Sequence, residues 1–262
     1  MKDQTIVVTG AASGIGRAVA LGAAQMGAKL ALLDLDAAGA AAIEAEAIGQ
    51  GARDALGLQC DVRDERQVHD AFAAVDSRLG PITGLFANAG VEVNAPTHEM
   101  KLDDWQRVLD VNLTGVFLCC KHALGSMLAQ GIGAIVCTSS PSSFVGFAGG
   151  GNGAYGASKG GVSAFVRSLA LDYAADGIRV NAIVPGATDT PMLLIGARPG
   201  EEEQTREEIV RMARQQIPLQ RLADPAEIAQ AVLWLLGPSS SYVTGSHLVC
   251  DGGLLAKGAV TF

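Results

Sequence analysis

A tyrosine and a lysine stand four residues apart, at Tyr155 and Lys159, inside a stretch that predicts a helix over Ala154–Ala175. Side chains at this spacing share one helix face, so the phenol and the ammonium group are expected to be neighbours. A phenol with an ordinary pKa of about 10 is a poor base at neutral pH, and a nearby positive charge favours its ionised form. The pair is therefore suited to moving a proton to or from a substrate oxygen.

A group of serines precedes this pair and follows a predicted strand. Ligands of a doubly wound sheet bind beyond the carboxyl ends of its strands, so a serine there can hold a substrate oxygen. The other interpretation is that these are turn residues around Pro141. The group comprises Ser139, Ser140, Ser142 and Ser143.

A glycine-rich turn at residues 9–16 separates the first predicted strand from the first predicted helix. In such a turn Gly10 permits a sharp bend, Gly14 lets the backbone approach a pyrophosphate, and Gly16 allows the helix to pack closely on the strand. The N–H groups at the start of the helix attract phosphate. The turn therefore predicts a dinucleotide cofactor.

Asp34 lies 18 residues beyond Gly16, at the end of the second predicted strand. A carboxylate here can accept hydrogen bonds from the ribose hydroxyls of adenosine and repels a 2′-phosphate, which predicts NAD rather than NADP. The alternative is that Asp34 is a turn or capping residue, a role that Asp36 could also fill.

Short apolar runs alternate with longer alanine-rich stretches. Most of the short runs have neighbouring apolar residues, as strands covered on both faces do. The alternation predicts one α/β domain over residues 1–262, with a Rossmann-like, doubly wound, mostly parallel sheet of about seven strands between two layers of helices. The predicted strands are Thr5–Thr9, Lys29–Leu33, Leu56–Cys60, Gly84–Ala87, Ala134–Thr138, Arg179–Val184 and His247–Cys250. The predicted helices are Ile15–Met26, Ala37–Ile48, Glu65–Leu79, Leu102–Ala129, Ala154–Ala175 and Pro225–Leu235.

The segment 188–217 departs from this alternation. It begins with Thr188-Asp189-Thr190-Pro191, contains a Pro-Gly pair at 199–200, and continues as an acidic, helical stretch. A long insertion after a strand end predicts a lid over a substrate-binding site.

The composition excludes several classes of protein. A formal net charge of −8 and a pI of about 5.0 argue against nucleic acid as a partner, because phosphate binding needs a basic face. No signal peptide and no stretch of membrane-spanning length is recognised, which predicts a protein that does not bind a membrane.

The cysteines and histidines indicate neither a disulfide framework nor a metal site. The five cysteines are an odd number without CxxC spacing, and most lie in apolar runs, which favours buried thiols in a reducing cytoplasm. The four histidines have no metal-binding spacing, so we expect no metal ion. These residues are Cys60, Cys119, Cys120, Cys137, Cys250, His69, His98, His122 and His247.

Together and in order, the motifs resemble those of the short-chain dehydrogenase/reductase family, over nearly the whole chain. The spacing Thr-Gly-x-x-x-Gly-Ile-Gly at 9–16 is similar to the family's own variant of the dinucleotide motif, and Tyr155-x-x-x-Lys159 is similar to its signature. Further resemblances are Cys60-Asp61-Val62, Asn88-Ala89-Gly90, Asn112, Pro185-Gly186 with Thr188 and Thr190, and Asp251-Gly252-Gly253.

The resemblance implies hydride transfer between a nicotinamide cofactor and an alcohol or ketone, with Tyr155 as the acid/base. It implies that Lys159 also binds the nicotinamide ribose, and that Asn112 holds a water linking Lys159 to solvent. The implied cofactor-binding residues are Gly10, Ser13, Gly14, Ile15, Gly16, Asp34, Leu35, Asp61, Val62, Asn88, Ala89, Gly90, Tyr155, Lys159, Pro185, Gly186, Thr188 and Thr190.

Two features depart from the family pattern. Ala87 replaces the first of two asparagines that usually precede Ala-Gly, a change expected to be harmless. The family's catalytic serine usually stands thirteen residues before the tyrosine, which gives Ser142, whereas the strand pattern gives Ser140. We favour Ser140, with two extra residues within 149–153, and keep Ser142 as the alternative and as a substrate contact.

The substrate is less well defined by the sequence. Most candidate substrate contacts are polar, and buried polar groups need hydrogen-bond partners, which favours a sugar or polyol as the substrate. The alternative is that these residues face water. The candidate substrate residues are Glu92, Asn94, Ser142, Asn152 and Met192.

Two other functions compete with an oxidising dehydrogenase. A 3-oxoacyl-type or other ketone reductase more often uses NADP in this family, which Asp34 disfavours. A non-catalytic dinucleotide-binding regulator would have lost Tyr155 or Lys159, and both are present.

In the family, the helices predicted at Leu102–Ala129 and Ala154–Ala175 pair between subunits, so we expect a homotetramer or a dimer.

Overall fold

All seven strands belong to one sheet in the computed structural model, which describes residues 1–2, 4–147, 150–194 and 202–257. The strand order is β3-β2-β1-β4-β5-β6-β7, and every neighbouring pair is parallel. The predicted Rossmann-like, doubly wound fold is confirmed. The strands are β1 (Thr5–Thr9), β2 (Lys29–Asp34), β3 (Asp54–Gln59), β4 (Gly84–Ala87), β5 (Gly133–Thr138), β6 (Ile178–Pro185) and β7 (His247–Cys250).

Helices cover both faces of the sheet, and each face has its own apolar core. Side chains alternate along a strand, so Ile6 and Val8 of β1 enter one core while Val7 enters the other. The first core lies under α1 (Gly14–Gln25), α2 (Ala37–Gly49) and α8 (Pro225–Leu236). The second lies under α3 (Glu65–Leu79), α5 (Gly115–Gln130) and α6 (Gly153–Tyr173).

Three helix starts are fixed by aspartate caps. The side chain of Asp36 accepts a hydrogen bond from the backbone at the start of α2, and Asp64 does the same for α3. Asp224 forms a reciprocal capping box with Glu227 at the start of α8. Such caps satisfy N–H groups that the helix itself leaves unpaired.

The prediction of one regular helix over Leu102–Ala129 is wrong in its middle. An α-helix, α4 (Leu102–Leu109), passes into a π-helical segment (Asp110–Thr114) before α5 begins. The N–H of Gly115 donates to the carbonyl of Asp110, five residues back, so the turn holds one residue more than an α-helix does.

The prediction that no stretch has membrane-spanning length also needs correction. Leu102–Gln130 is long and apolar enough by length and composition, but half of its most apolar window is buried inside the protein. Its packing against α3, α6, β4 and β5 makes it part of the core of this fold.

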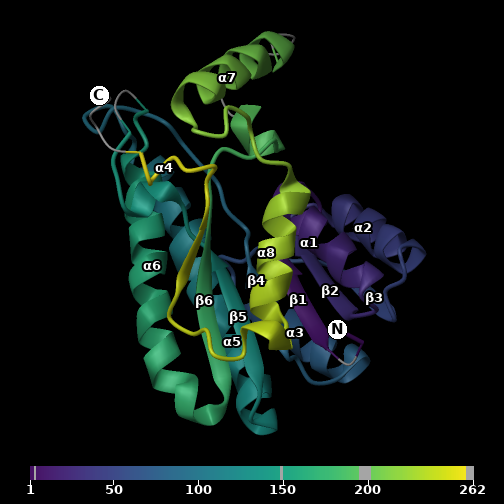
Figure 1. Cartoon of the computed structure of the whole chain (residues 1–262). Coiled ribbons are helices and arrows are strands. Elements are labelled where there is room, and N and C mark those ends of the chain that lie inside the picture. Colours follow the sequence, from purple (N-terminus) through teal and green to yellow (C-terminus); the bar gives the residue numbers. More distant parts are fainter. Residues whose placement is uncertain (3, 148–149, 195–201, 258–262) are drawn as a thin grey trace.

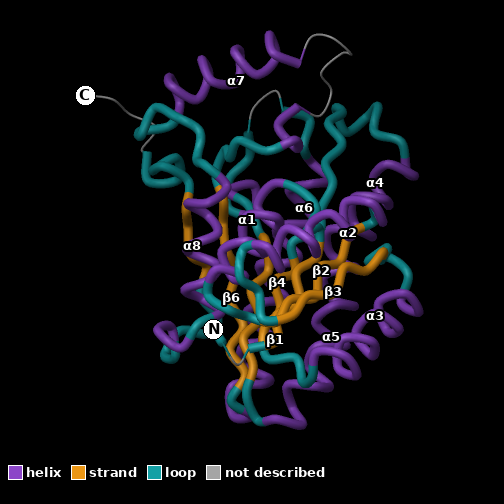
Figure 2. Tube along the Cα trace, turned by 90° about the vertical axis from the view of Figure 1, so that its right-hand side faces the viewer, coloured by secondary structure: helices purple, strands orange, loops and turns teal. Residues whose placement is uncertain are grey.

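The sheet order reverses between β1 and β4, because β2 and β3 lie on one side of β1 and the later strands on the other. The loops that follow β1 and β4 therefore diverge and leave a crevice at the carboxyl edge. Above this edge lies the predicted lid, with a 3₁₀ turn at Pro191–Leu194 and helix α7 (Glu202–Gln216), at the top of both views (Figure 1, Figure 2). Residues 195–201 of the lid lie outside the described residues.

Candidate active site

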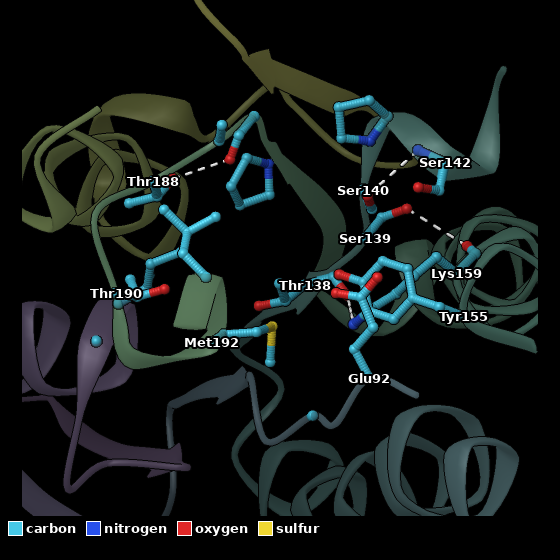
Figure 3. A pocket seen from close by; sticks show the side chains of 18 of the residues that line it. Glu92, Thr138, Ser139, Ser140, Ser142, Tyr155, Lys159, Thr188, Thr190 and Met192 are labelled. Carbon is cyan, nitrogen blue, oxygen red and sulfur yellow. Dashed lines mark hydrogen bonds between the residues drawn. The ribbon is translucent and has the colours of Figure 1, made fainter. Parts of the chain in front are cut away.

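A cavity of about 480 Å³ opens at the carboxyl edge of the sheet. It is lined by residues that follow β1, β4, β5 and β6, together with side chains from α6 and α7. Of the predicted catalytic residues, Ser140, Tyr155 and Lys159 line it (Figure 3). The fourth, Asn112, lies outside the lining.

Tyr155 and Lys159 are neighbours on α6, as their spacing predicts. The Nζ atom of Lys159 lies 5.5 Å from the centre of the Tyr155 ring and donates a hydrogen bond of 2.8 Å to the carbonyl oxygen of Thr138. Thr138 is the last residue of β5, so the sheet holds the ammonium group in place. The phenol and the ammonium thus share one wall of the cavity.

On balance, the surroundings of Tyr155 disfavour its ionised form. Burial and the negative charge of Glu92 together raise the pKa of Tyr155 to about 12, against the lowering effect of the Ser140 side chain. Burial also lowers the pKa of Lys159 to about 8, against the opposing effects of Cys137 and Glu92. Both shifts disfavour charge in a dry site, so a neutral phenol beside an ammonium is the resting state near pH 7.

The hydroxyl groups of the serines after β5 have different hydrogen-bond partners. Ser139 shares a hydrogen bond of 2.7 Å with Ser163, and Ser142 accepts one of 3.3 Å from Asn152 Nδ2. Ser140 caps the short 3₁₀ turn after β5, and its side chain lowers the pKa of the Tyr155 phenol. Ser140 is therefore the serine whose side chain acts on the tyrosine.

Asn112 is fully buried in the π-helical segment. Its side chain bonds both backbone polar groups of Val91, and its Nδ2 also donates to Ser158 at 3.1 Å. A Cβ on Gly90 would lie 3.4 Å from Asn112 Oδ1 and 3.8 Å from Lys159 Nζ. Asn112 thus stands across Gly90 from the lysine without contacting the cavity.

The glycine turn has the geometry that phosphate binding requires. Gly10 and Gly14 have φ of +63° and +53°, a region that side chains disfavour. A Cβ on Gly16 would lie 2.0 Å from the carbonyl oxygen of Gly10, so only glycine fits there. Ser13 precedes α1 with no capping hydrogen bond from its side chain in the described part of the chain, which leaves its hydroxyl for a ligand.

Comparison with known proteins decides the family. Residues 10–255 match the family model described as enoyl-(acyl carrier protein) reductase. Cis-4-hydroxycyclohexanecarboxylate dehydrogenase of Sinomonas cyclohexanicum is 43% identical, over 97% of each chain. The chain belongs to the short-chain dehydrogenase/reductase family.

Solved structures agree with this assignment. The crystal structure of levodione reductase superposes with a TM-score of 0.91 at 36% identity, over 98% of this chain and 100% of that one. A short-chain type dehydrogenase/reductase from Mycobacterium marinum gives 0.89 at 32% identity, over 97% and 96%. The protein is therefore an oxidoreductase that acts on an alcohol or ketone with a nicotinamide dinucleotide, NAD or NADP.

Most residues expected to bind the cofactor of this dehydrogenase/reductase line the cavity. They come from the glycine turn, from the end of β4, from α6 and from the segment after β6. Those that line it are Gly10, Ser13, Gly14, Ile15, Asn88, Ala89, Gly90, Tyr155, Lys159, Pro185, Gly186, Thr188 and Thr190. A Cβ on Gly14 would lie 3.2 Å from the Thr190 side chain, so the turn and the segment after β6 approach closely there.

Five expected cofactor residues lie outside the cavity lining: Gly16, Asp34, Leu35, Asp61 and Val62. Asp34 ends β2, and its Oδ2 accepts a 2.9 Å hydrogen bond from Ala12 N in the glycine turn. Asp61 bonds Arg63 through both oxygens, and this contact lowers the pKa of the carboxyl. Gly16 belongs to the glycine turn itself, whereas the other four residues are at or just beyond the carboxyl ends of β2 and β3, where the adenosine end of a dinucleotide is expected.

The expected substrate residues separate into two groups. Glu92, Ser142 and Met192 line the cavity. Asn94 and Asn152 do not, and each instead bonds a residue that does: Asn94 bonds Glu92, with its amide oriented to donate, and Asn152 bonds Ser142.

Sequence reasoning missed several cavity residues. Among them are Thr138, which holds Lys159, and Phe147, which lies on the loop after β5. On α7 it missed Ile209 and Met212, although the spacing of apolar residues there predicts an amphipathic helix with one face toward the protein.

Proposed function

We propose that the protein is an NAD-preferring dehydrogenase that oxidises a secondary alcohol of a sugar or polyol. The observation that carries the proposal is the convergence of Ser140, Tyr155 and Lys159 in one cavity whose other end is the glycine turn. A regulator that only senses a dinucleotide would have no use for this arrangement.

In this proposal Tyr155 takes the proton from the carbinol oxygen, which Ser140 holds by a hydrogen bond. Lys159 has a pKa of about 8, so it is charged at neutral pH and its ammonium favours the ionised phenol. Asn112, through a water, passes the proton on to solvent, as the family resemblance implies. A bound oxidised nicotinamide would supply the hydride acceptor, and its positive charge before the transfer would favour the ionised phenol.

Two contacts support NAD over NADP. The Asp34 carboxylate is oriented by backbone N–H groups of Ala12 and Asp36, at 2.9 and 3.1 Å, and still has lone pairs for two ribose hydroxyls. Arg17, on the neighbouring helix, bonds Glu46 at 2.6 Å and so is engaged elsewhere. A 2′-phosphate at this place would meet a carboxylate rather than a free guanidinium.

The polar residues of the pocket support the substrate class. Glu92, Ser140 and Ser142 offer hydrogen bonds to a hydroxylated substrate, while Met192 and Phe147 supply apolar surface. Relatives include dehydrogenases named for cyclic alcohols, a class of compound that a cavity of this size accommodates.

We also propose a cytoplasmic homotetramer, or a dimer, in which α5 and α6 pair between subunits. Phe117 of α5 is 45% exposed and Leu171 of α6 is 83% exposed, so both helices present apolar surface to a partner subunit. Phe117 also packs against Phe165 of α6, with ring centres 6.1 Å apart. The free, mostly buried cysteines fit a reducing compartment.

The test is a spectrophotometric assay of NADH formation with NAD and a panel of sugars, polyols and secondary alcohols. We expect turnover with polyhydroxylated substrates and at least 10-fold higher kcat/KM with NAD than with NADP, since charge-assisted hydrogen bonds typically contribute about 1.5–3 kcal/mol. No oxidation of any alcohol, with ketone reduction that prefers NADPH, would instead support the ketone-reductase alternative.

A further inference from the structure

Among the described residues that line the cavity, Glu92 carries the acidic side chain, and it faces the proton-transfer groups. It lies just beyond β4, partly buried, and lines the cavity together with Tyr155 and Lys159 (Figure 3). Its charge acts on both of them, raising the pKa of Tyr155 and of Lys159. A carboxylate beside the base of a dehydrogenase works against ionisation of that base, so its presence calls for another role.

The carboxylate is held by its neighbours at one oxygen only. Asn94 donates to Glu92 Oε1 at 3.0 Å and to the carbonyl oxygen of Gly150 at 3.2 Å. Ala95 N donates to Gly151 O at 2.9 Å, and Gly151 has a φ of +58°, with a Cβ there 2.9 Å from the Ala95 carbonyl carbon. The segment after β4 is thus joined to the loop before α6.

The second oxygen of Glu92 has no protein donor among the described residues. An ionised carboxylate can only accept hydrogen bonds, and a partly buried one that remains unpaired is costly. Burial accordingly raises the pKa of Glu92, while Asn94 and the charge of Lys159 lower it. Because Glu92 lines the cavity, a donor on the molecule that fills it can pair with this free oxygen.

We propose that Glu92 is a specificity-determining residue whose free oxygen binds a second hydrogen-bond donor of the substrate, a hydroxyl or ammonium group close to the reacting carbinol. This inference rests on the proposed function, because it takes the carbinol to lie at Tyr155 and Ser140. Substrates with a single hydroxyl leave the carboxylate unpaired and are disfavoured.

The two donor types have different electrostatic consequences. A hydroxyl donor pairs with Glu92 and leaves its charge in place. An ammonium donor neutralises that charge, which removes an influence that raises the pKa of Tyr155. The charged groups that face the phenol are Glu92 and Lys159, so an ammonium substrate would shift the pH–rate profile for oxidation toward lower pH relative to a diol.

The experiment compares kcat/KM for three matched substrates: cyclohexanol, 1,2-cyclohexanediol and 2-aminocyclohexanol. The wild type is expected to prefer the diol or the amino alcohol over cyclohexanol by roughly 10- to 100-fold. In Glu92→Gln the free oxygen becomes an amide nitrogen that cannot accept, so this preference is expected to fall at least 10-fold. The relative rates of diol and amino alcohol identify which donor the site takes.

Controls separate the inference from the proposed function. Glu99→Gln changes an exposed carboxylate seven residues further on and is expected to keep the wild-type preference. Glu92→Asp keeps an acceptor, so it is expected to retain more of the preference than Glu92→Gln. NADH binding and thermal melting check that each variant is folded. The inference about Glu92 is overturned if the wild type has equal kcat/KM for cyclohexanol and the diol, or if folded Glu92→Gln keeps the wild-type preference. In either case, oxidation of cyclohexanol would still support the proposed dehydrogenase function.

Discussion

The side chain of Asn112 bonds both backbone polar groups of Val91. Its Oδ1 accepts from Val91 N at 2.8 Å, and its Nδ2 donates to Val91 O at 2.9 Å. Val91 lies between Gly90 and Glu92, so this buried contact fixes the segment that carries the carboxylate of the pocket. Asn112 therefore has a structural task in addition to the proton-relay role that the family resemblance implies.

Replacing Asn112 with alanine should destabilise the fold. The change leaves the N–H and C=O groups of Val91 without partners in a buried site, and the expected loss is about 2–4 kcal/mol in the free energy of unfolding. Urea denaturation at fixed protein concentration measures it. The control is Gln106→Ala, whose exposed side chain donates a hydrogen bond to Asp110 at the start of the π-helical segment and should change stability by less than about 0.5 kcal/mol. Equal losses for the two variants would contradict the structural role.

Tyr155→Phe should lower kcat by about 10²–10⁴-fold, the range over which a positioned acid or base usually acts. The ring still packs beside Lys159, so NADH binding, measured by fluorescence titration, should change little. A variant with near-normal turnover would show that another group is the base.

Asp34→Ala should reduce kcat/KM for NAD by roughly 10- to 100-fold and narrow its advantage over NADP, because the ribose loses its charged acceptor. The matched control is Asp36→Ala, which removes the cap of α2. That variant should lose about 1 kcal/mol of stability yet keep the NAD preference. If Asp34→Ala favours NAD as strongly as the wild type, Asp34 does not select the cofactor.

The pH dependence of oxidation follows from the charges around Tyr155. The rate rises with pH as the phenol ionises, and the negative charge of Glu92 raises the pKa of Tyr155, so this charge holds the rising limb at higher pH. Removing it in Glu92→Gln lowers the pKa and should move the limb toward lower pH, whereas Lys159 continues to favour ionisation. Initial rates with a mono-alcohol across a pH series measure the shift. If the rising part of the pH–rate profile stays in place or moves to higher pH in Glu92→Gln, the charge of Glu92 does not affect the pKa of the phenol.

Gly16→Ala should abolish cofactor binding, because the added methyl group would lie 2.0 Å from the carbonyl oxygen of Gly10 and force the turn open. Gly49→Ala provides the control at an exposed position at the end of α2, where a Cβ meets nothing within 4 Å. The control should bind NADH normally and be as stable as the wild type or slightly more so. Both variants are compared by NADH titration and circular dichroism, and normal NADH binding by Gly16→Ala would contradict the packing role.

Much of the sheet could be predicted from the sequence because its strands are buried on both faces. The bounds predicted for β1, β4 and β7 are those of the structure, and every residue of β1 and β4 is buried. The edge strand β3 is less regular: it begins at Asp54 rather than Leu56, where a polar residue gives no apolar signal. The glycine turn was predictable because backbone geometry restricts it to glycine.

The π-helical segment at Asp110–Thr114 could not be predicted, since one extra residue in a turn hardly changes the apolar period of a long helix. The sequence likewise predicted that Lys159 would favour the ionised phenol, but it could not show that burial raises the pKa of Tyr155 to about 12. Burial depends on loops and on α7, whose positions relative to the phenol are set by tertiary packing. The contact of Glu92 with Asn94 and the 150–151 loop has the same origin.

The reversal of strand order between β1 and β4 has a consequence for how such an enzyme can change over evolutionary time. The carboxylate that we expect to bind the adenosine ribose is that of Asp34, at the end of β2. The groups that we expect beside the carbinol come from Thr138–Lys159. These stretches lie on opposite sides of β1 in the sheet, so a substitution in one stretch leaves the residues of the other in place. During evolution, a few substitutions near Asp34 can therefore change the preference between NAD and NADP. The reaction stays the same, because its residues come from a later part of the chain.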